Sequence, residues 1–310
     1  ASRSTVSRRI EGVSPPAMSA SSPPAASYYD VRLEAGECLL DDLRQRCGLK
    51  RDDLLERKVA GLIRQRPQAT LFSWLDDLRD RPANQAEWLA IVDAVTIHET
   101  YFFRDPNQLE VLRQVLLPEQ IAACIAADQR RITVWSAGCA SGEEAYSVAI
   151  LLLEALGDAG ENPSDWHLDV LGTDVSAVMV DVARAAVYGG PGLDSFRQLP
   201  PEHGSSFVPD RASKKRRGVH RDVRALVRFE QHNLVDSLPP VTAVDIALCR
   251  NVFIYLDGSA QERAVGLLRT ALRPGGDLLL GVTDRLPVGC GFERSATGTA
   301  VIYRKQGGST

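Results

Sequence analysis

The sequence predicts a mostly parallel, doubly wound α/β sheet that follows a small all-helical domain. From residue 29 to about 112, the apolar residues recur at helical spacing. After residue 112, short apolar runs alternate with helical stretches, which is typical of a parallel sheet wrapped by helices. Within this second part, the apolar strand 132–135 enters a loop of small residues and then a helix. That arrangement opens many ligand-binding α/β sheets.

The composition excludes several classes of protein. The chain has 310 residues with 44% hydrophobic content, which suits one large or two modest domains. Its net charge of −4 argues against general affinity for nucleic acid. It has no run of 18 apolar residues and no apolar signal-peptide core, so we expect no membrane insertion. The six cysteines lie far apart without a CxxC pair, which disfavours a metal site and fits a cytoplasmic protein.

The first part of the chain divides into a tail and a helical domain. Residues 1–28 are rich in Ser, Pro and Ala, and we interpret them as a disordered tail. Residues 29–112 form the expected helical domain, whose first helix is closed by Gly48. The apolar faces of its helices are Leu39, Leu40, Leu43 and Cys47; Leu54, Leu55, Val59 and Ile63; Leu71, Trp74, Leu75 and Leu78; and Trp88, Ile91, Val92 and Val95.

Residues 113–310 form the expected sheet domain, entered through a helix over 108–126. We predict strands at 131–136, 167–173, 226–230, 243–249 and 277–282, with a closing strand or strand pair at 291–304. Helices are expected from Glu143 to about Gly157, at 176–186 and at 259–272. The segment 189–226 is rich in Pro and Gly and has no clear strand pattern, so we interpret it as a partly flexible insertion.

The loop Ala137–Gly142 carries little side-chain bulk, so its backbone N–H groups are expected to approach a ligand closely. The alternative is tight packing of strand on helix. The loop is neither Gly-x-Gly-x-x-Gly nor a phosphate-binding loop that ends in Lys-Ser/Thr. Glu143 and Glu144 follow it, and carboxylates there would repel phosphates. A cationic or neutral nucleoside ligand therefore fits better than a dinucleotide.

Two polar residues follow neighbouring strands at the same expected edge of the sheet. Asp174 ends the second strand, where an acid commonly accepts hydrogen bonds from ribose hydroxyls. The alternative role is a helix N-cap, since Asp174-Val-Ser176 precedes a helix. Asn233 follows the strand at 226–230, where it would recognise an adenine edge or simply form a turn.

Two further clusters combine aromatic and charged residues. The strand at 243–249 ends in Arg250 and Asn251, with Tyr255 shortly after, and these form either a ligand site or a structural ion pair and a buried tyrosine. The junction Thr100-Tyr-Phe-Phe-Arg104 would bury its phenylalanines and hold Arg104 in place. The alternative is an interdomain hinge in which Arg104 pairs with Asp105 or Glu99.

These segments together resemble the CheR-type chemotaxis protein-glutamate methyltransferases. The resemblance covers about residues 30–304 and rests on ordered motifs: Thr100-Tyr-Phe-Phe-Arg104, Trp135-Ser-Ala-Gly-Cys-Ala-Ser-Gly-Glu-Glu144, Gly172-Thr-Asp174, Asn233-Leu234 and Cys249-Arg-Asn-Val-Phe-Ile-Tyr255. It implies a class I S-adenosylmethionine-dependent methyltransferase sheet of Rossmann-like form, with an N-terminal all-helical domain. It also implies methylation of glutamate side chains on the cytoplasmic domains of methyl-accepting chemoreceptors, with S-adenosylhomocysteine as the other product.

The resemblance also implies residue roles. Arg104 and Tyr255 would lie beside the transferred methyl group and the substrate carboxylate. The residues expected to line the cofactor are Thr100, Arg104, Ala137, Gly138, Glu143, Asp174, Asn233, Arg250 and Asn251. The competing interpretation is a signalling module with a methyltransferase fold that binds or modifies a protein outside chemotaxis. We expect a monomer that binds no nucleic acid.

The chain departs from the family pattern in two places. After the strand at 277–282 it has Gly281-Val-Thr-Asp284 where the family commonly has a Gly-His-Ser-Glu-like turn. Residues 200–228 occupy the place of a small β-subdomain that contacts receptors in the family, but their strand pattern is weak. Their basic run Lys214–Arg217 is a further difference.

Overall fold

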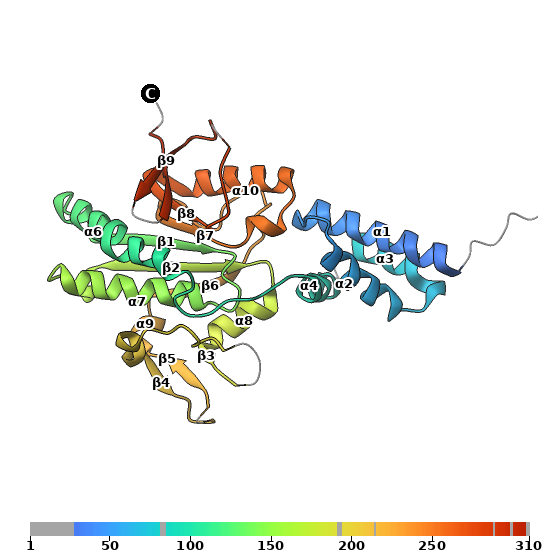
Figure 1. Cartoon of the computed structure of the whole chain (residues 1–310), viewed down its shortest axis with the longest axis horizontal. Coiled ribbons are helices and arrows are strands. Elements are labelled where there is room, and N and C mark those ends of the chain that lie inside the picture. The colour runs from blue at the N-terminus through green and yellow to red at the C-terminus, as the bar shows by residue number, and fades with distance from the viewer. Residues whose placement is uncertain are drawn as a thin grey trace, which may run out of the picture.

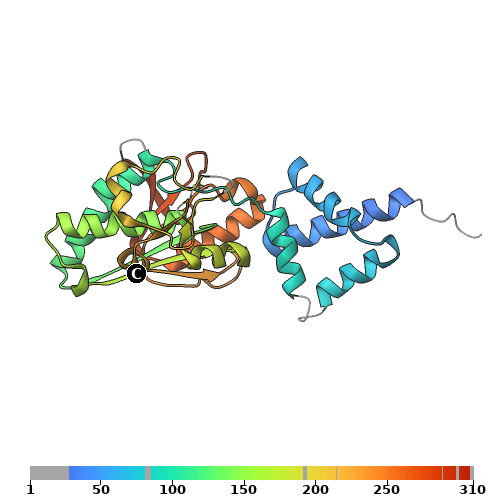
Figure 2. The same cartoon turned by 90° about the horizontal axis from the view of Figure 1, so that it is seen from below.

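The computed structural model describes residues 28–80, 85–190, 194–213, 215–287, 289–297 and 300–307. The expected disordered tail lies outside these residues, apart from Tyr28. The chain forms two parts that lie end to end, a group of helices and a helix-covered sheet (Figure 1). Figure 2 shows the same division from below, with the connecting chain running between the two parts.

The helical part buries the apolar faces predicted from the sequence. Its elements are α1 (Tyr28–Cys47), α2 (Asp53–Arg64), the 3-10 turn η1 (Gln68–Thr70), α3 (Leu71–Asp80) and α4 (Gln85–Val95). Asp52 caps α2, because its carboxylate accepts the Leu55 N–H at 2.8 Å. Gly48 ends α1 with a positive φ of 70°. The predicted faces meet in one buried cluster, although Leu54 is exposed.

The second part contains a seven-stranded sheet in the order β6-β2-β1-β7-β8-β10-β9. Its strands are β1 (Arg131–Ala137), β2 (His167–Asp174), β6 (Val227–Gln231), β7 (Val244–Cys249), β8 (Leu272–Leu280), β9 (Phe292–Thr297) and β10 (Ala300–Lys305). The strands from β6 to β8 are parallel, and β10 is antiparallel to both of its neighbours. The predicted parallel sheet and closing strand pair are confirmed. The strand order reverses at β1, which is where such sheets bind ligands.

Helices cover both faces of this sheet, because successive side chains of a strand point to opposite faces. On β1, Ile132 and Val134 pack into the cluster that includes α6 (Leu117–Ala126), α7 (Glu143–Asp158) and α8 (Ala177–Ala185). Trp135 and Ala137 pack into the cluster that includes α10 (Gly258–Ala271). Within the described part of the chain, no helix is both long and apolar enough to cross a membrane.

The structure corrects two predicted elements. The single helix expected at 108–126 is a run of α5 (Pro106–Val111), the π-helical η3 (Leu112–Leu116) and α6. Pro118 explains the irregularity, because it lacks an N–H and its ring crowds the carbonyl of residue 114. β8 begins at Leu272 rather than at 277, opposite a register shift between Val244 and Ile246 of β7.

The segment 189–226 has more structure than its sequence indicates. Its strands β4 (Phe207–Pro209) and β5 (Arg217–Val219) form an antiparallel sheet with β3 (Val187–Tyr188). The turn η5 (Pro201–Ser206) and the short helix α9 (Arg221–Arg224) complete it. Strands of two or three residues give almost no alternating pattern, which is why the sequence did not reveal them. Aromatic contacts with Phe102 hold this subdomain: the Phe102 ring stacks on Phe196 and meets the rings of Tyr188 and Phe207 edge to face.

Candidate functional site

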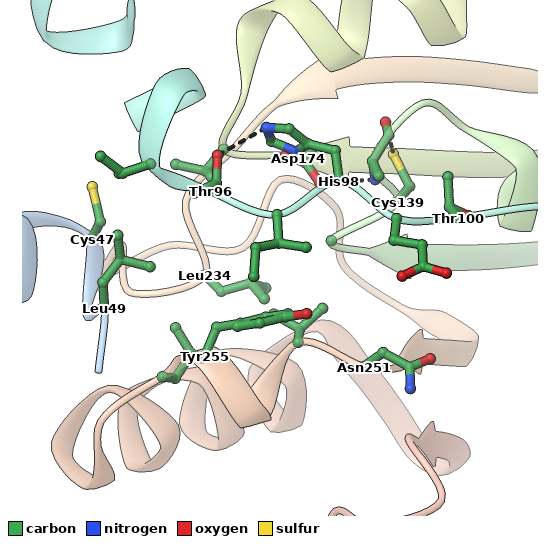
Figure 3. A pocket seen from close by; sticks show the side chains of 18 of the residues that line it. Cys47, Leu49, Thr96, His98, Thr100, Cys139, Asp174, Leu234, Asn251 and Tyr255 are labelled. Atoms are coloured by element: carbon green, nitrogen blue, oxygen red, sulfur yellow. Dashed lines mark hydrogen bonds between the residues drawn. The ribbon is translucent and has the colours of Figure 1, made fainter. Parts of the chain in front are cut away.

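A pocket opens where the helical part meets the carboxyl ends of the parallel strands. Its walls come from the α1–α2 connection, the segment 95–104, and the loops that follow β1, β2, β6 and β7. Figure 3 shows side chains from both parts converging on it, with Leu49 at one end and Asn251 at the other. Most of the predicted site residues line it: Thr100, Arg104, Gly138, Asp174, Asn233, Arg250, Asn251 and Tyr255.

Ala137 and Glu143 do not line the pocket. Ala137 is fully buried among apolar residues beneath the sheet edge. Glu143 is 2% exposed, and its carboxylate accepts hydrogen bonds from the hydroxyls of Ser141 at 2.7 Å and Ser195 at 2.8 Å. Burial raises its pKa, and the two serines oppose this rise. Its neighbour Glu144 lines the pocket instead, so the acid that faces a ligand is the second of the pair.

The backbone N–H groups of the small-residue loop make hydrogen bonds within the protein, whereas the sequence led us to expect that they approach a ligand. Gly138 and Cys139 donate to the Thr173 carbonyl at 2.8 and 2.9 Å, and Gly142 donates to the Cys139 carbonyl at 2.9 Å. A side chain at position 138 would meet Val252 Cγ2 at 2.4 Å. The small residues therefore permit close packing, which was the alternative interpretation.

Asp174 is anchored by the loop and still faces the pocket. Its Oδ2 accepts the Ala140 N–H at 2.8 Å and its Oδ1 accepts the Ser176 N–H at 2.9 Å. The N-cap of α8 is Ser176, whose hydroxyl accepts the Met179 N–H. Asp174 is 8% exposed and burial raises its pKa. Each carboxylate oxygen retains acceptor capacity towards the pocket, which suits ribose hydroxyls.

His98 also lines the pocket, although it was not among the residues predicted from the sequence. Its Nε2 lies 2.9 Å from Thr96 Oγ1, and the Thr96 hydroxyl already donates to the Val92 carbonyl at 2.7 Å. Thr96 therefore accepts at that contact and His98 donates from Nε2, which leaves Nδ1 for other partners. Figure 3 shows the imidazole beside Asp174. The sequence around His98 gave no sign of this role, because only the fold brings His98 to Asp174, 76 residues further along the chain.

Asn233 combines a turn role with an interdomain contact. Its Oδ1 accepts the Val235 N–H at 3.3 Å, and its Nδ2 donates to the Arg46 carbonyl of α1 at 2.7 Å. The structure therefore bears out the turn interpretation and also keeps Asn233 in the pocket wall.

Arg250 is the buried junction of the site. Its guanidinium donates to Gln108 Oε1 at 2.8 Å, Glu144 Oε2 at 2.9 Å, the Arg104 carbonyl at 2.6 Å and Asp105 Oδ2 at 3.1 Å. Its side chain is only 2% exposed. Asp105 is thus the partner of Arg250 rather than of Arg104, and the structural ion-pair interpretation of Arg250 holds.

The aromatic junction holds Arg104 in the pocket. Phe102 is fully buried and Phe103, which takes a positive φ of 58°, is 4% exposed. Arg104 donates from Nη1 to the Glu99 carbonyl at 2.6 Å. Tyr255 lies on the pocket floor (Figure 3), where burial raises its phenol pKa and Arg104 lowers it. One cationic and one phenolic donor therefore face the same cavity.

The pocket suits a nucleoside that carries positive charge. It combines the carboxylate of Asp174, which is held by backbone N–H groups, with apolar side chains such as Leu234 and Val175. The carboxylate of Glu144 is already paired with Arg250. The described residues hold no cluster of His, Cys, Asp or Glu arranged for a metal ion. S-adenosylmethionine fits this set, because it has ribose hydroxyls, an adenine ring and a sulfonium but no phosphate.

Comparison with known proteins agrees with this geometry. Residues 98–300 match the family described as CheR methyltransferase, SAM binding domain. The chain is 36% identical over 270 residues to a chemotaxis protein methyltransferase of Vibrio parahaemolyticus, covering 84% of this chain and 93% of that protein. It is also 36% identical over 269 residues to chemotaxis protein methyltransferase 1 of Vibrio cholerae, covering 84% and 93%.

Proposed function

The chain belongs to the CheR methyltransferase family, and we propose that it methylates glutamate side chains on the cytoplasmic domains of chemoreceptors. S-adenosylmethionine is the methyl donor of this family's binding domain. The observation that carries the proposal is that Arg104 and Tyr255 line the same pocket as Asp174. A carboxylate substrate needs such cationic and phenolic donors.

The residues of the pocket divide into holding and positioning roles. Asp174 would accept hydrogen bonds from the ribose hydroxyls, and Leu234, Val175 and Ile97 would offer apolar surface to the adenine ring. When bound, S-adenosylmethionine supplies a methyl group that moves to a carboxylate oxygen while the carbon–sulfur electron pair stays on sulfur, so ester and thioether replace an anion and a cation. Because charge disappears in this transfer, a site that excludes water favours it.

The substrate side of the reaction needs orientation rather than a base. A glutamate carboxylate is ionised at neutral pH, with a reference pKa of about 4.3. Arg104 can hold it through charge-assisted hydrogen bonds, provided that one oxygen lone pair stays free to attack. Tyr255 can donate its hydroxyl to the same carboxylate. Fixing the two reacting groups in line supplies a large share of the rate.

The test is methyl transfer from radiolabelled S-adenosylmethionine to purified receptor cytoplasmic fragments, followed by mild alkali. A glutamate ester releases volatile labelled methanol. Arg104→Ala should lower kcat/KM by about 100-fold, the loss expected when a charged hydrogen bond is removed. Arg113→Ala is the matched control, because Arg113 is a half-exposed arginine that pairs with Glu110 outside the pocket. An alkali-stable label, or near wild-type activity of Arg104→Ala, would overturn the proposal.

A further inference from the structure

We propose that Gly48–Lys50, the segment that leaves α1 of the helical part, positions Tyr255 for methyl transfer through a backbone bridge. The inference rests on the function proposed for Tyr255. It assigns the helical part a role in the transfer step, in addition to forming one wall of the pocket.

The bridge consists of hydrogen bonds on either side of an antiparallel pair. The Lys50 N–H donates to the Tyr255 carbonyl at 2.8 Å, and the Asp257 N–H donates to the Gly48 carbonyl at 2.9 Å. Between them, Leu49 faces Leu256 as an isolated antiparallel β-bridge. Both leucines are buried, at 9% and 6% exposure. The carbonyl of Tyr255 itself is therefore tied to the helical part.

Tyr255 depends on this tie because its own element is short. It ends η6 (Phe253–Tyr255), a single 3-10 turn, and such turns have poor hydrogen-bond geometry. The Gln261 side chain holds the neighbouring carbonyls of Phe253 and Leu256 at 2.9 and 3.2 Å. Among the described residues, the Tyr255 carbonyl accepts its backbone hydrogen bond from the Lys50 N–H. Displacing the segment Gly48–Lys50 would therefore move the aromatic ring of Tyr255.

Gly48 allows the bridge to form. It takes a positive φ of 70°, and a side chain there would meet Ala260 Cβ at 2.4 Å and Val235 Cγ1 at 2.9 Å. Its close approach to the first turn of α10 brings Leu49 and Lys50 beside Leu256 and Tyr255. Gly48 thus ends α1 and also permits contact between the two parts of the chain.

An ion pair supports the same junction from outside. Arg44 Nε lies 2.8 Å from Asp257 Oδ2, and Asp257 also caps α10 by accepting the Ala260 N–H at 2.8 Å. Arg44 is 62% exposed, so this pair contributes little by itself. The backbone bridge, which is buried at its centre, therefore carries the positioning.

The sharpest test compares Lys50→Pro with Lys50→Ala. Proline removes the N–H that binds the Tyr255 carbonyl, whereas alanine keeps it, and both remove the ammonium group. The preceding Leu49 is in an extended bridge, which proline tolerates. Relative to Lys50→Ala, Lys50→Pro should lower kcat about tenfold and leave KM for S-adenosylmethionine within about twofold, since misplacement alone costs rate.

A double-mutant cycle separates positioning from a general structural effect. If Lys50 acts through Tyr255, adding Lys50→Pro to Tyr255→Phe should lower kcat by less than about twofold further. Gly48→Ala provides a second route to the same displacement. Its matched control is Gly36→Ala within α1, where a side chain would meet nothing within 4 Å.

A measurement that does not depend on catalytic activity tests the bridge separately from the proposed function. Titration of ¹³C-labelled tyrosine by NMR reports the phenol pKa of Tyr255, which burial raises above its ordinary value of 10.0. That pKa should change in Lys50→Pro and stay unchanged in Lys50→Ala. Failure of wild-type protein to methylate receptors would overturn the proposed function alone. Equal kcat and equal Tyr255 titration in the two Lys50 variants would overturn the bridge.

Discussion

Two buried carboxylates at the carboxyl edge of the sheet show how one residue type takes different roles. Asp174 faces the pocket and is held by backbone N–H groups of Ala140 and Ser176. Glu143 points away from the pocket and is held by the hydroxyls of Ser141 and Ser195. Burial raises the pKa of both. The two carboxylates differ in direction, because the backbone orients Asp174 towards the pocket and Glu143 towards the protein interior.

Replacing Glu143 tests its structural role through pH. Because the folded pKa of Glu143 lies above 4.5, its ionisation lowers the free energy of unfolding. This cost is absent below 4.5, grows as pH rises from 4.5 to the folded pKa, and stays constant above it. Glu143→Gln removes this cost. The free energy of unfolding of the variant, measured with urea from pH 4.5 to 8, should therefore rise relative to wild type as pH increases.

The control for this pH series is Glu110→Gln, for which the sign reverses. Arg113 lowers the pKa of Glu110, so this carboxylate contributes stability that is present above its unfolded pKa and lost as pH falls through the folded one. Its replacement should cost slightly more at pH 8 than at pH 4.5. The same slope in both variants would contradict the assignment of Glu143.

At the scale of elements, the loop between β1 and α7 is shaped by packing. Gly138 has a positive φ of 81° and lies against Val252, which follows β7. Gly142 has a φ of 92° and lies against Ala183 of α8 and Phe229 of β6. Neighbouring elements thus close on the loop, and this closure holds Ala140 where its N–H reaches Asp174.

Gly138→Ala should destabilise the protein by about 1–3 kcal/mol, since it combines left-handed backbone strain with overpacking. Thermal unfolding measures this change. Gly157→Ala is the control, because a side chain there meets nothing within 4 Å and alanine favours a helix. Adding Val252→Ala to Gly138→Ala should recover part of the loss, because it removes the 2.4 Å contact. Equal stability of the two glycine variants would contradict the packing role.

At the scale of the whole molecule, Arg250 joins the connection between the two parts to the sheet edge. Its partners come from the start of α5, from α7 and from the segment that carries Arg104. Gln108 extends the junction by donating to the Leu280 carbonyl of β8 at 2.8 Å. The position of Arg104 is therefore set by a buried network rather than by its own exposed contact with Glu99.

Arg250→Met should lower the free energy of unfolding by about 3–5 kcal/mol, because it leaves Glu144 without its cation in a mostly buried site. Denaturant unfolding monitored by tryptophan fluorescence measures this loss. The half-exposed Arg113→Ala serves as reference and should cost less than about 1 kcal/mol. If Arg250→Met lowered the free energy of unfolding as little as Arg113→Ala, the buried hydrogen bonds of Arg250 would not be what stabilises this junction.

The sequence by itself determined the parallel sheet, the helical part before it and the set of polar residues at the strand ends. Hydrophobic periodicity fixes which face of each element is buried, and parallel strands bring residues such as Asp174, Asn233 and Arg250 to one edge. Motif order also identified the family. Short strands such as β4 and β5, however, have too few residues to show a period.

Only the tertiary structure decided which way each side chain points and which partners it meets. It turned Glu143 inwards and Glu144 towards the pocket, brought His98 beside Asp174, and used the loop N–H groups internally. It also joined Lys50 to Tyr255 across the two parts. The physical reason is that these contacts join residues far apart in the chain. Local spacing carries no information about their final separation or orientation.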